Sequence, residues 1–343
     1  MKLSIITINY NNAEGLRKTL ASVAAQTYSH IEHIIVDGAS TDGSVDVIRE
    51  YESTLASNLS PLASRLKWLS EPDKGIYNAM NKGIEIALGR RVVNSFNRSE
   101  LVEDKNKGRE MDINSFNRSE LVASTPYTLH PTPPQPCEHY VQILNSGDLL
   151  AAPDVTERMM AALNELMNEG VNELREVPIF YGNMLKSYDG KTIISRDTCG
   201  GKMYTPESFL YFYKGTLNHD CAYIRRDLFE KYGLYNEQMK ICSDWEWYVR
   251  AIVLGGEKPV YTNIDVTIFD MNGLSESHGK NAELIKKERR EYLESILPPA
   301  VLYDYDQFAF PLLQYQRLKK YHLWGLVHFI ERVLFKLEKW GMR

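Results

Sequence analysis

The sequence is poor in cysteine and has none of the spacings that bind zinc. Its 343 residues include four cysteines, without a Cys-x-x-Cys pair. Scattered cysteines of this kind are typical of a reduced compartment and exclude a disulfide framework. We expect all four to pack as small apolar side chains. They are Cys137, Cys199, Cys221 and Cys242.

The chain also lacks a basic excess and a long apolar run. Lys and Arg number 40 against 45 Asp and Glu, which argues against a nucleic acid partner. No apolar stretch reaches the roughly 18 residues of a transmembrane helix. The apolar start, Leu3 to Ile8, is too short for a signal peptide and is followed at once by Asn9. These absences predict a globular protein that stays in the cytoplasm.

Strand and helix patterns alternate over the first ninety residues. The apolar runs Leu3 to Ile8 and His33 to Val36 flank a segment in which Leu16, Leu20 and Val23 recur at helical spacing. A β-α-β unit of this kind predicts a parallel sheet. Further helices are expected at 45–51, 77–88 and 155–167, and further strands at 67–69, 140–144 and 179–181.

The alternation stops between residues 90 and 139. The sequence NSFNRSELV occurs there twice, at 94–102 and 114–122, and a proline-rich stretch follows. One duplication does not make a repeat array. We interpret the segment as an insertion, for which two interpretations remain open: contact with an acceptor or partner, and a neutral duplication in a tolerant surface loop.

Polar residues follow several of the predicted strands. Asn9 and Asn11 come after the first strand, Asp37 after the second, and Asp148 after the strand that follows the insertion. Each alone is also typical of a turn. Because ligands of open parallel sheets bind beyond the carboxyl ends of the strands, their joint placement predicts a nucleotide site.

Five ordered segments together form a specific pattern. They are TINYNN, VDGASTDGS, SEPDKGIYNAMNKGIEIALG, ILNSGD and LNHDCAYIRRDLFEKYGLYNEQMKICSDWEWYVRA. In this order they resemble the catalytic domain of family-2 glycosyltransferases, among them enzymes that build bacterial surface polysaccharides. The resemblance implies the A-type fold: an α/β architecture with a Rossmann-like mixed, mainly parallel central sheet flanked by helices. We expect a catalytic domain at 1–270, with the insertion at 90–139, and a C-terminal helical extension at 271–343.

The resemblance also implies roles for residues that bind the donor. It assigns Thr7, Asn9 and Asp37 to the nucleoside, and Asp73 to the other side of that pocket. Lys74 is a candidate phosphate contact, although an exposed lysine on a turn is more often simply solvated. Asp148 would bind a divalent cation, Mn²⁺ or Mg²⁺, which commonly needs one or two carboxylates besides phosphate oxygens and water. The remaining donor-binding candidate is Asn145, which stands where the family often has an acid.

Asp244 is the candidate catalytic base. The Ser-x-x-Glu spacing from Ser243 to Glu246 predicts a capping box, so a helix should begin at Ser243 with Asp244 in its first turn. His219 matches a histidine often present in these relatives and could contact the diphosphate, the metal or the acceptor; a core histidine is equally consistent. The aromatic residues around the base favour core packing over sugar stacking. They are Trp245, Trp247 and Tyr248.

The resemblance implies an inverting transfer of a sugar from a nucleotide diphosphate donor, by default a UDP-sugar, to a hydroxyl of a saccharide or lipid-linked acceptor. Two alternatives stay open. A sugar nucleotidyltransferase would need a glycine-rich loop with a basic residue after the first strand, which TINYNNAEGL lacks. A nucleotide-sugar-binding protein without turnover is consistent with Asn145 and the insertion.

The C-terminal part carries an amphipathic stripe. Its apolar members are Leu323, Leu326, Ile330, Leu334 and Leu337. The stripe predicts a helix that packs on the catalytic domain or on a second subunit of a homodimer. Alternatively, its basic and aromatic flanks suit peripheral contact with the inner face of a membrane.

Overall fold

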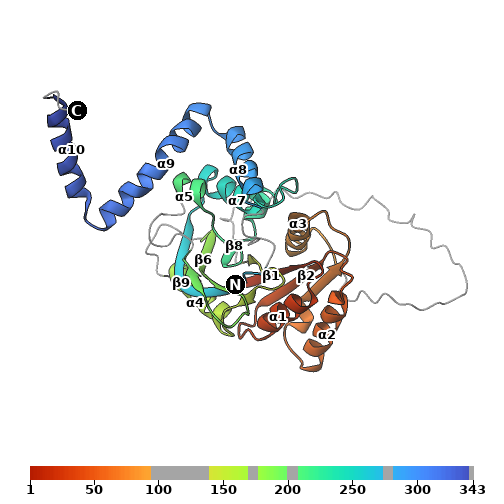
Figure 1. Cartoon of the computed structure of the whole chain (residues 1–343). Helices are drawn as coiled ribbons and strands as arrows, with labels where there is room; N and C mark the ends of the chain where they lie inside the picture. The colour runs from red at the N-terminus through yellow and green to blue at the C-terminus, as the bar shows by residue number, and fades with distance from the viewer. Residues whose placement is uncertain (94–138, 169–176, 199–207, 273–280, 340–343) are drawn as a thin grey trace, which may run out of the picture.

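The fold is built on one mixed sheet. The computed structural model describes residues 1–93, 139–168, 177–198, 208–272 and 281–339, and the repeats of the predicted insertion, with Cys137 and Cys199, lie outside these residues. The strands run in the order β3-β2-β1-β4-β8-β6-β9-β5, and β7 pairs with β6 (Figure 1). Their bounds are β1 Lys2–Asn9, β2 Ile31–Asp37, β3 Leu66–Ser70, β4 His139–Ile143, β5 Leu149–Leu150, β6 Ile179–Ser187, β7 Ser195–Asp197, β8 Ala222–Arg225 and β9 Pro259–Asp270.

The N-terminal half of the sheet is parallel, as the β-α-β pattern predicts. β1 pairs with β2 and β4, and β2 pairs with β3, all in parallel. The C-terminal half is mixed, because β8 runs antiparallel to β4 and β6 whereas β9 runs parallel to β6. The predicted α/β class with a Rossmann-like mixed sheet is confirmed, and its parallel character is concentrated in the N-terminal half.

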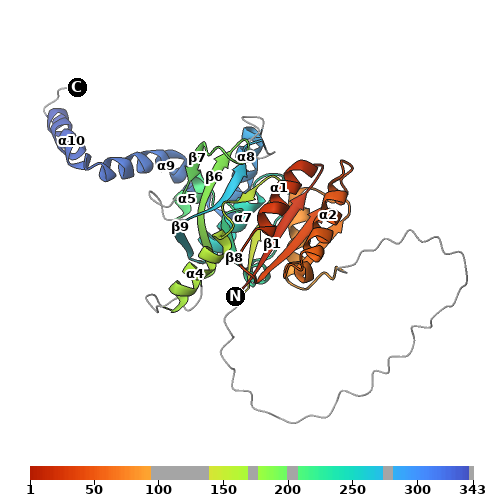
Figure 2. The same cartoon turned by 90° about the horizontal axis from the view of Figure 1, so that it is seen from below.

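Helices cover both faces of the N-terminal half (Figure 2). On one face, Gly83 of α3 lies against Ile6 of β1 so closely that an added Cβ would come within 2.3 Å of the Ile6 Cγ2 atom. On the opposite face, Tyr51 of α2 contacts His33 of β2. The bounds of the first seven helices are α1 Ala13–Ala24, α2 Ser44–Ser57, α3 Ile76–Ala87, α4 Val155–Asn168, α5 Phe209–Lys214, α6 Leu228–Tyr232 and α7 Ser243–Tyr248.

Three helices follow the last strand. They are α8 Ala282–Ile296, α9 Pro299–Lys320 and α10 Trp324–Lys339. α8 packs on the catalytic part, and α9 contacts α5 through Tyr305 and Asp306 before it and α10 lead away as an arm (Figures 1 and 2). α10 has no buried residue, so within the described residues its apolar stripe does not pack on the catalytic domain; the other two expectations, a second subunit or a membrane surface, stay predictions. The domain boundary at residue 270 stays a prediction.

Candidate active site

Asp37 lies at the carboxyl end of β2, beside Asn9 at the end of β1. Parallel register pairs these two residues, and the Asn9 Nδ2 atom donates to Asp37 Oδ1 at 2.8 Å. Ser40 donates twice, from its hydroxyl to Oδ1 at 2.5 Å and from its backbone N–H to Oδ2 at 3.0 Å. Ser70, at the end of β3, donates its hydroxyl to Oδ2 at 2.6 Å. Four protein donors therefore fix the carboxylate of Asp37, which is fully buried.

Thr7 does not join this group. Its side chain is fully buried, and its hydroxyl lies 3.0 Å from the Nε2 atom of His33, whose Nδ1 atom lies 3.1 Å from the hydroxyl of Tyr51. Thr7 and Asn9 lie two positions apart on β1 and share one face of the sheet, but Thr7 lies further from the end of the strand, where His33 covers it. Protein groups thus cover the Thr7 side chain, and its predicted role at the nucleoside stays a prediction.

The accessible part of this edge is formed by Tyr10 and Asp73. Tyr10 is 66% exposed, and the missing side chain of Gly38 leaves room for both: an added Cβ would come within 2.4 Å of Asp73 Oδ2 and 3.0 Å of the Tyr10 ring. Asp73 accepts from the backbone N–H of Gly75 at 2.9 Å. The sequence argument missed Tyr10, although a large aromatic residue directly after a buried strand was the available signal.

Lys82 holds the turn that carries Asp73. It is buried, and its ammonium group donates to the carbonyl of Pro72 and pairs with Glu71, both at 2.8 Å. Lys74, in contrast, is exposed and lines a cavity of about 320 Å³ between residues 74–78 and 237–240. Its predicted phosphate contact stays a prediction.

Asp148 follows β4 and is buried. Its Oδ1 atom accepts from the backbone N–H of Asp270 at 2.9 Å. Burial and the nearby carboxylate of Asp220 raise the pKa of Asp148 well above its usual range. A cation at this point would relieve that repulsion. The Oδ1 atom of Asn145 is buried and has no hydrogen-bond partner among the described residues, so it too offers a free oxygen.

These two residues fit a divalent cation that takes most of its ligands from a substrate. No group of three or more His, Cys, Asp or Glu residues that could hold a metal occurs in the described part of the chain. A hard cation such as Mg²⁺ is commonly bound through one or two carboxylates, substrate phosphates and water. Asp148 with Asn145 supplies this kind of incomplete ligand set.

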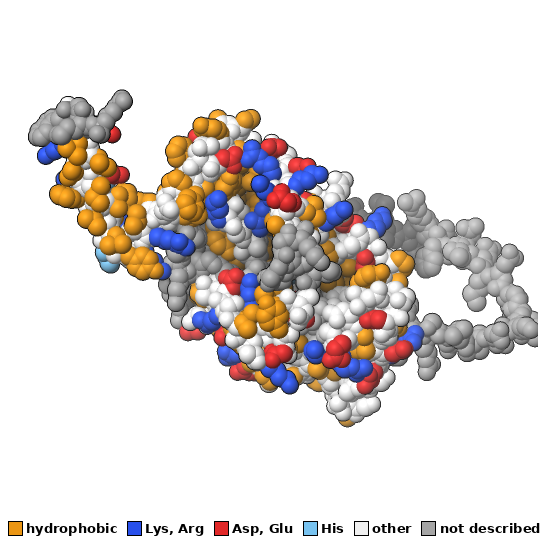
Figure 3. All heavy atoms as spheres, viewed as in Figure 1, with side chains coloured by type: hydrophobic (Ala, Val, Ile, Leu, Met, Phe, Trp, Pro, Cys, Tyr) orange, Lys and Arg blue, Asp and Glu red, His pale blue; other side chains and the backbone are white. Residues whose placement is uncertain are grey.

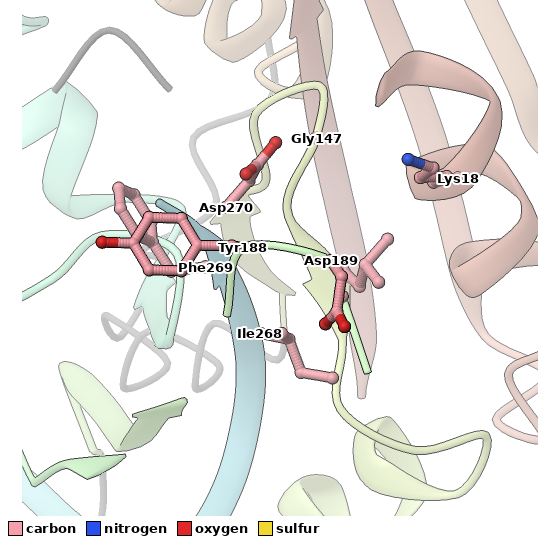
Figure 4. A pocket seen from close by; sticks show the side chains of 9 residues that line it. Lys18, Gly147, Tyr188, Asp189, Ile268, Phe269 and Asp270 are labelled. Carbon is pink, nitrogen blue, oxygen red and sulfur yellow. The ribbon is translucent and has the colours of Figure 1, made fainter. Parts of the chain in front are cut away.

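Gly147 shapes the turn that presents Asp148. Its φ of +109° lies in the region that favours glycine, and an added Cβ would come within 3.2 Å of the Asp270 carboxylate. Figure 4 shows the Asp270 side chain beside this turn, at a small pocket of about 20 Å³ that Lys18 and Tyr188 also line. Glycine thus lets β9 approach closely and supply the Asp270 N–H to Asp148.

Asp244 lies in the first turn of α7, as predicted, and both of its oxygens have partners. His219 places Nδ1 3.2 Å from Asp244 Oδ2, and Tyr77 donates its hydroxyl to Oδ1 at 3.0 Å. The other ring nitrogen of His219 lies 3.2 Å from the Asn145 Nδ2 atom. His219 therefore links the predicted base to the turn that carries the predicted metal ligand. Tyr77 was missed because nothing in the sequence brings α3 next to α7.

Asp244 and His219 shift each other's pKa in the direction opposite to burial. Burial would raise the pKa of Asp244, but the hydrogen bond and charge of His219, with the Tyr77 hydroxyl, lower it overall. Burial would lower the pKa of His219, but Asp244, Asp220 and Asp148 together raise it. The geometry therefore favours an ionised Asp244 carboxylate, which is the form that can accept a proton.

The predicted capping box does not form. Ser243 begins α7, but its hydroxyl accepts from the backbone N–H of Asn236 at 2.6 Å. Glu246 pairs with Arg250 at 2.9 Å instead of capping the helix. Core packing of the neighbouring aromatic residues is confirmed by their burial. They are Trp245, Trp247 and Tyr248, and free Cys221 and Cys242 are buried as well.

Comparisons with known proteins show which sequences and folds this chain resembles. Residues 4–95 match the family model "Glycosyl transferase family 2". An uncharacterized glycosyltransferase of Mycobacterium tuberculosis is 43% identical over 88 residues, which cover 25% of this chain and 30% of that relative. A PGL/p-HBAD biosynthesis glycosyltransferase of the same organism is 22% identical over 248 residues, or 72% of this chain and 68% of the relative. The match thus spans less than a third of the first relative's length.

A solved structure shares the fold. The crystal structure of Staphylococcus aureus TarS residues 1–349 in complex with UDP-GlcNAc superposes with a TM-score of 0.52 and 15% identity, covering 93% of this chain and 73% of that one. At this identity the likeness concerns the fold. The family model shows that residues 4–95, which carry the first three of the five motifs, are family-2 glycosyltransferase sequence, and the solved structure shows a shared fold.

Proposed function

We propose that the chain is an inverting glycosyltransferase that uses a nucleotide diphosphate sugar, by preference a UDP-sugar. The single observation that carries the proposal is the contact chain from Asp244 through His219 to Asn145, which joins the candidate base to the Asp148 turn. The UDP-GlcNAc complex of the structural neighbour supports the choice of donor. Bound by Asp148 and Asn145, a Mn²⁺ or Mg²⁺ ion would neutralise charge on the donor diphosphate.

Other residues of this chain would bind the nucleoside and remove the acceptor proton. Asp73 and Tyr10 form the accessible side of the nucleoside pocket, whereas Asn9 and Asp37 shape it from within. Asp244 accepts the proton of the acceptor hydroxyl while that oxygen bonds to the anomeric carbon, and the bond to the nucleoside diphosphate breaks. One displacement of this kind inverts the anomeric centre. A saccharide or a lipid-linked saccharide supplies the hydroxyl.

Release of UDP tests this proposal. Purified wild type, Asp244→Asn and the surface control Asp46→Asn are incubated with a panel of UDP-sugars and Mn²⁺. We expect Asp244→Asn to lower the rate of release by about 10²- to 10⁴-fold, the usual contribution of a general base. Asp46, whose side chain is 83% exposed, should tolerate the change. Nucleotide binding without release by any of the three proteins would contradict the proposal and favour a binding protein.

The arm formed by α9 and α10 supports a lipid-linked acceptor. No helix among the described residues has the length and apolarity to cross a bilayer. Nevertheless, Leu326, Phe329 and Leu334 on α10 are each more than half exposed, and orange side chains gather along this arm in Figure 3. Residues 315–339 contain six basic and two acidic residues, although the whole chain carries a net charge of -5. We propose that this arm binds an anionic membrane surface.

Flotation with vesicles tests the arm. The full chain should float with vesicles containing phosphatidylglycerol and less with pure phosphatidylcholine, and a chain ending at Tyr315 should not float. Phe329→Glu should weaken binding, whereas Glu331→Gln on the polar face should not. If the full chain forms a dimer through the arm and never floats, the apolar face is a subunit contact instead.

A further inference from the structure

Helix α8 supplies a buried carboxylate to the segment just before the candidate base. Glu288 is 8% exposed. Its Oε1 atom accepts from the backbone N–H of Lys240 at 2.6 Å, and its Oε2 atom accepts from those of Ile241 and Cys242 at 3.1 and 3.0 Å. Three successive backbone donors therefore converge on one side chain that lies more than forty residues further along the chain.

One of these contacts, to the Cys242 N–H, lies at the start of α7, whereas the Lys240 and Ile241 N–H groups precede the helix. Cys242 occupies the cap position of α7 and makes no side-chain capping bond, and the Ser243 hydroxyl is already engaged elsewhere. The first N–H groups of a helix need acceptors from outside it, and a negative charge is favourable there. Glu288 thus fixes the chain immediately before Asp244.

α8 contacts the base helix at further points. The guanidinium of Arg289 lies 4.9 Å from the ring centre of Trp245, and the Tyr292 ring packs edge-on against Trp245 at 5.7 Å. Trp245 directly follows Asp244 in the chain. α8 therefore holds α7 on both sides of the base, before it through Glu288 and after it through Trp245.

The same segment also forms one wall of the cavity of about 320 Å³. Residues 237–240 face Lys74–Asn78 across it, and Tyr77, one of its lining residues, donates to Asp244. The Lys240 N–H that Glu288 binds belongs to this wall. Glu288 therefore acts on the base and on the cavity beside it, whereas the edge formed by Asp37 and Asp73 lies on other elements.

We infer that Glu288 is a positioning residue for the transfer reaction: it holds residues 240–242 so that Asp244 and the adjacent cavity wall keep their geometry. This inference rests on the proposed role of Asp244 as the base. It also assigns α8, within the predicted C-terminal extension, to the working parts of the catalytic site. Loss of the Glu288 carboxylate should slow the chemical step and leave nucleotide affinity unchanged.

Glu288→Gln is the informative variant, because glutamine has a similar size but only one accepting oxygen for three N–H groups. Glu291→Gln is the matched control, since Glu291 lies on the same helix with its side chain 63% exposed. The measurements are UDP release from a UDP-sugar with Mn²⁺, and the Kd for UDP. We expect kcat to fall by about tenfold to a hundredfold in Glu288→Gln, with KM for the donor and Kd for UDP unchanged. Equal rates for the two variants would overturn the inference.

Hydrogen exchange at the three amides gives a second, independent reading. In the wild type, the N–H groups of Lys240, Ile241 and Cys242 should exchange slowly. In Glu288→Gln the same three groups should exchange faster, while the amides of the core strands stay protected. Fast exchange in the wild type would refute the positioning role even if Glu288→Gln fails to fold. Absence of UDP release from the wild type would refute the proposed function, a result distinguishable from a release rate that Glu288→Gln leaves unchanged.

Discussion

Asp37→Asn should destabilise the fold, which separates a structural role of Asp37 from a direct role in nucleotide binding. The carboxylate accepts four hydrogen bonds while fully buried. Asparagine keeps one oxygen, which can serve Asn9 and the Ser40 hydroxyl. Its NH₂ group then faces the Ser40 N–H and the Ser70 hydroxyl. The Ser70 hydroxyl can rotate and accept a hydrogen bond from this NH₂ group, whereas the Ser40 backbone N–H can only donate.

The expected cost follows from these contacts. Two hydrogen bonds to a charged group are lost, each worth about 1.5–3 kcal/mol, and rotation of the Ser70 hydroxyl recovers about 1 kcal/mol. We therefore expect the free energy of unfolding to drop by roughly 2–5 kcal/mol. Urea denaturation followed by circular dichroism measures this drop as a lower midpoint with an unchanged slope.

Asp73→Asn is the matched comparison at the same edge. Asp73 is partly exposed and accepts from the Gly75 N–H, so its replacement should leave the urea midpoint near that of the wild type and weaken UDP binding. If Asp37→Asn unfolds at the wild-type urea concentration yet loses UDP affinity, the carboxylate is not committed to the fold, and the reasoning is refuted.

Three further predictions follow from the packing and the charges. Gly83→Ala should lower stability by about 1–3 kcal/mol in urea denaturation, because the added methyl meets Ile6 inside the sheet–helix contact; an unchanged midpoint would contradict this packing. Burial lowers the pKa of His33 from 6.5 to about 3, so the unfolded chain binds a proton that the folded one does not, and stability should fall by up to about 1.4 kcal/mol per unit as pH drops below 6.5 toward 3. His33→Gln should remove that part of the pH dependence, and an identical slope in both proteins would speak against it. Asn145→Asp adds a carboxylate beside Asp148, so a lower Mn²⁺ concentration should half-saturate UDP binding; a higher one would count against cation binding at this turn.

The sequence predicts the sheet well where burial is continuous. The runs around Leu3 to Ile8 and His33 to Val36 are strands at nearly the expected positions, because an apolar stretch between polar turns has few other solutions. Because every residue of such a strand is buried, the sequence does not show which side chains reach the carboxyl-terminal edge of the sheet. Thr7 stands two positions before Asn9, yet its hydroxyl lies on His33 inside the fold.

The sequence predicts where the candidate base Asp244 lies in its helix, but it does not predict the side chains that surround it. A motif places Asp244 at the start of a helix, and the structure agrees. Tyr77, which touches its carboxylate, lies more than 160 residues earlier, and Glu288, which orders the preceding amides, comes more than forty residues later. Local spacing favoured Ser243 as the cap because a distant carboxylate leaves no signal in a window of four residues.

Helix α3 connects the two sides of the proposed reaction through rigid backbone. Near its start, Tyr77 contacts Asp244, and one turn later Lys82 holds the turn of Asp73. In the proposed reaction, a single helix therefore sets the distance between the Asp73 turn and the Asp244 carboxylate. A displacement of α3 would then move the Asp73 turn and the contact to Asp244 together.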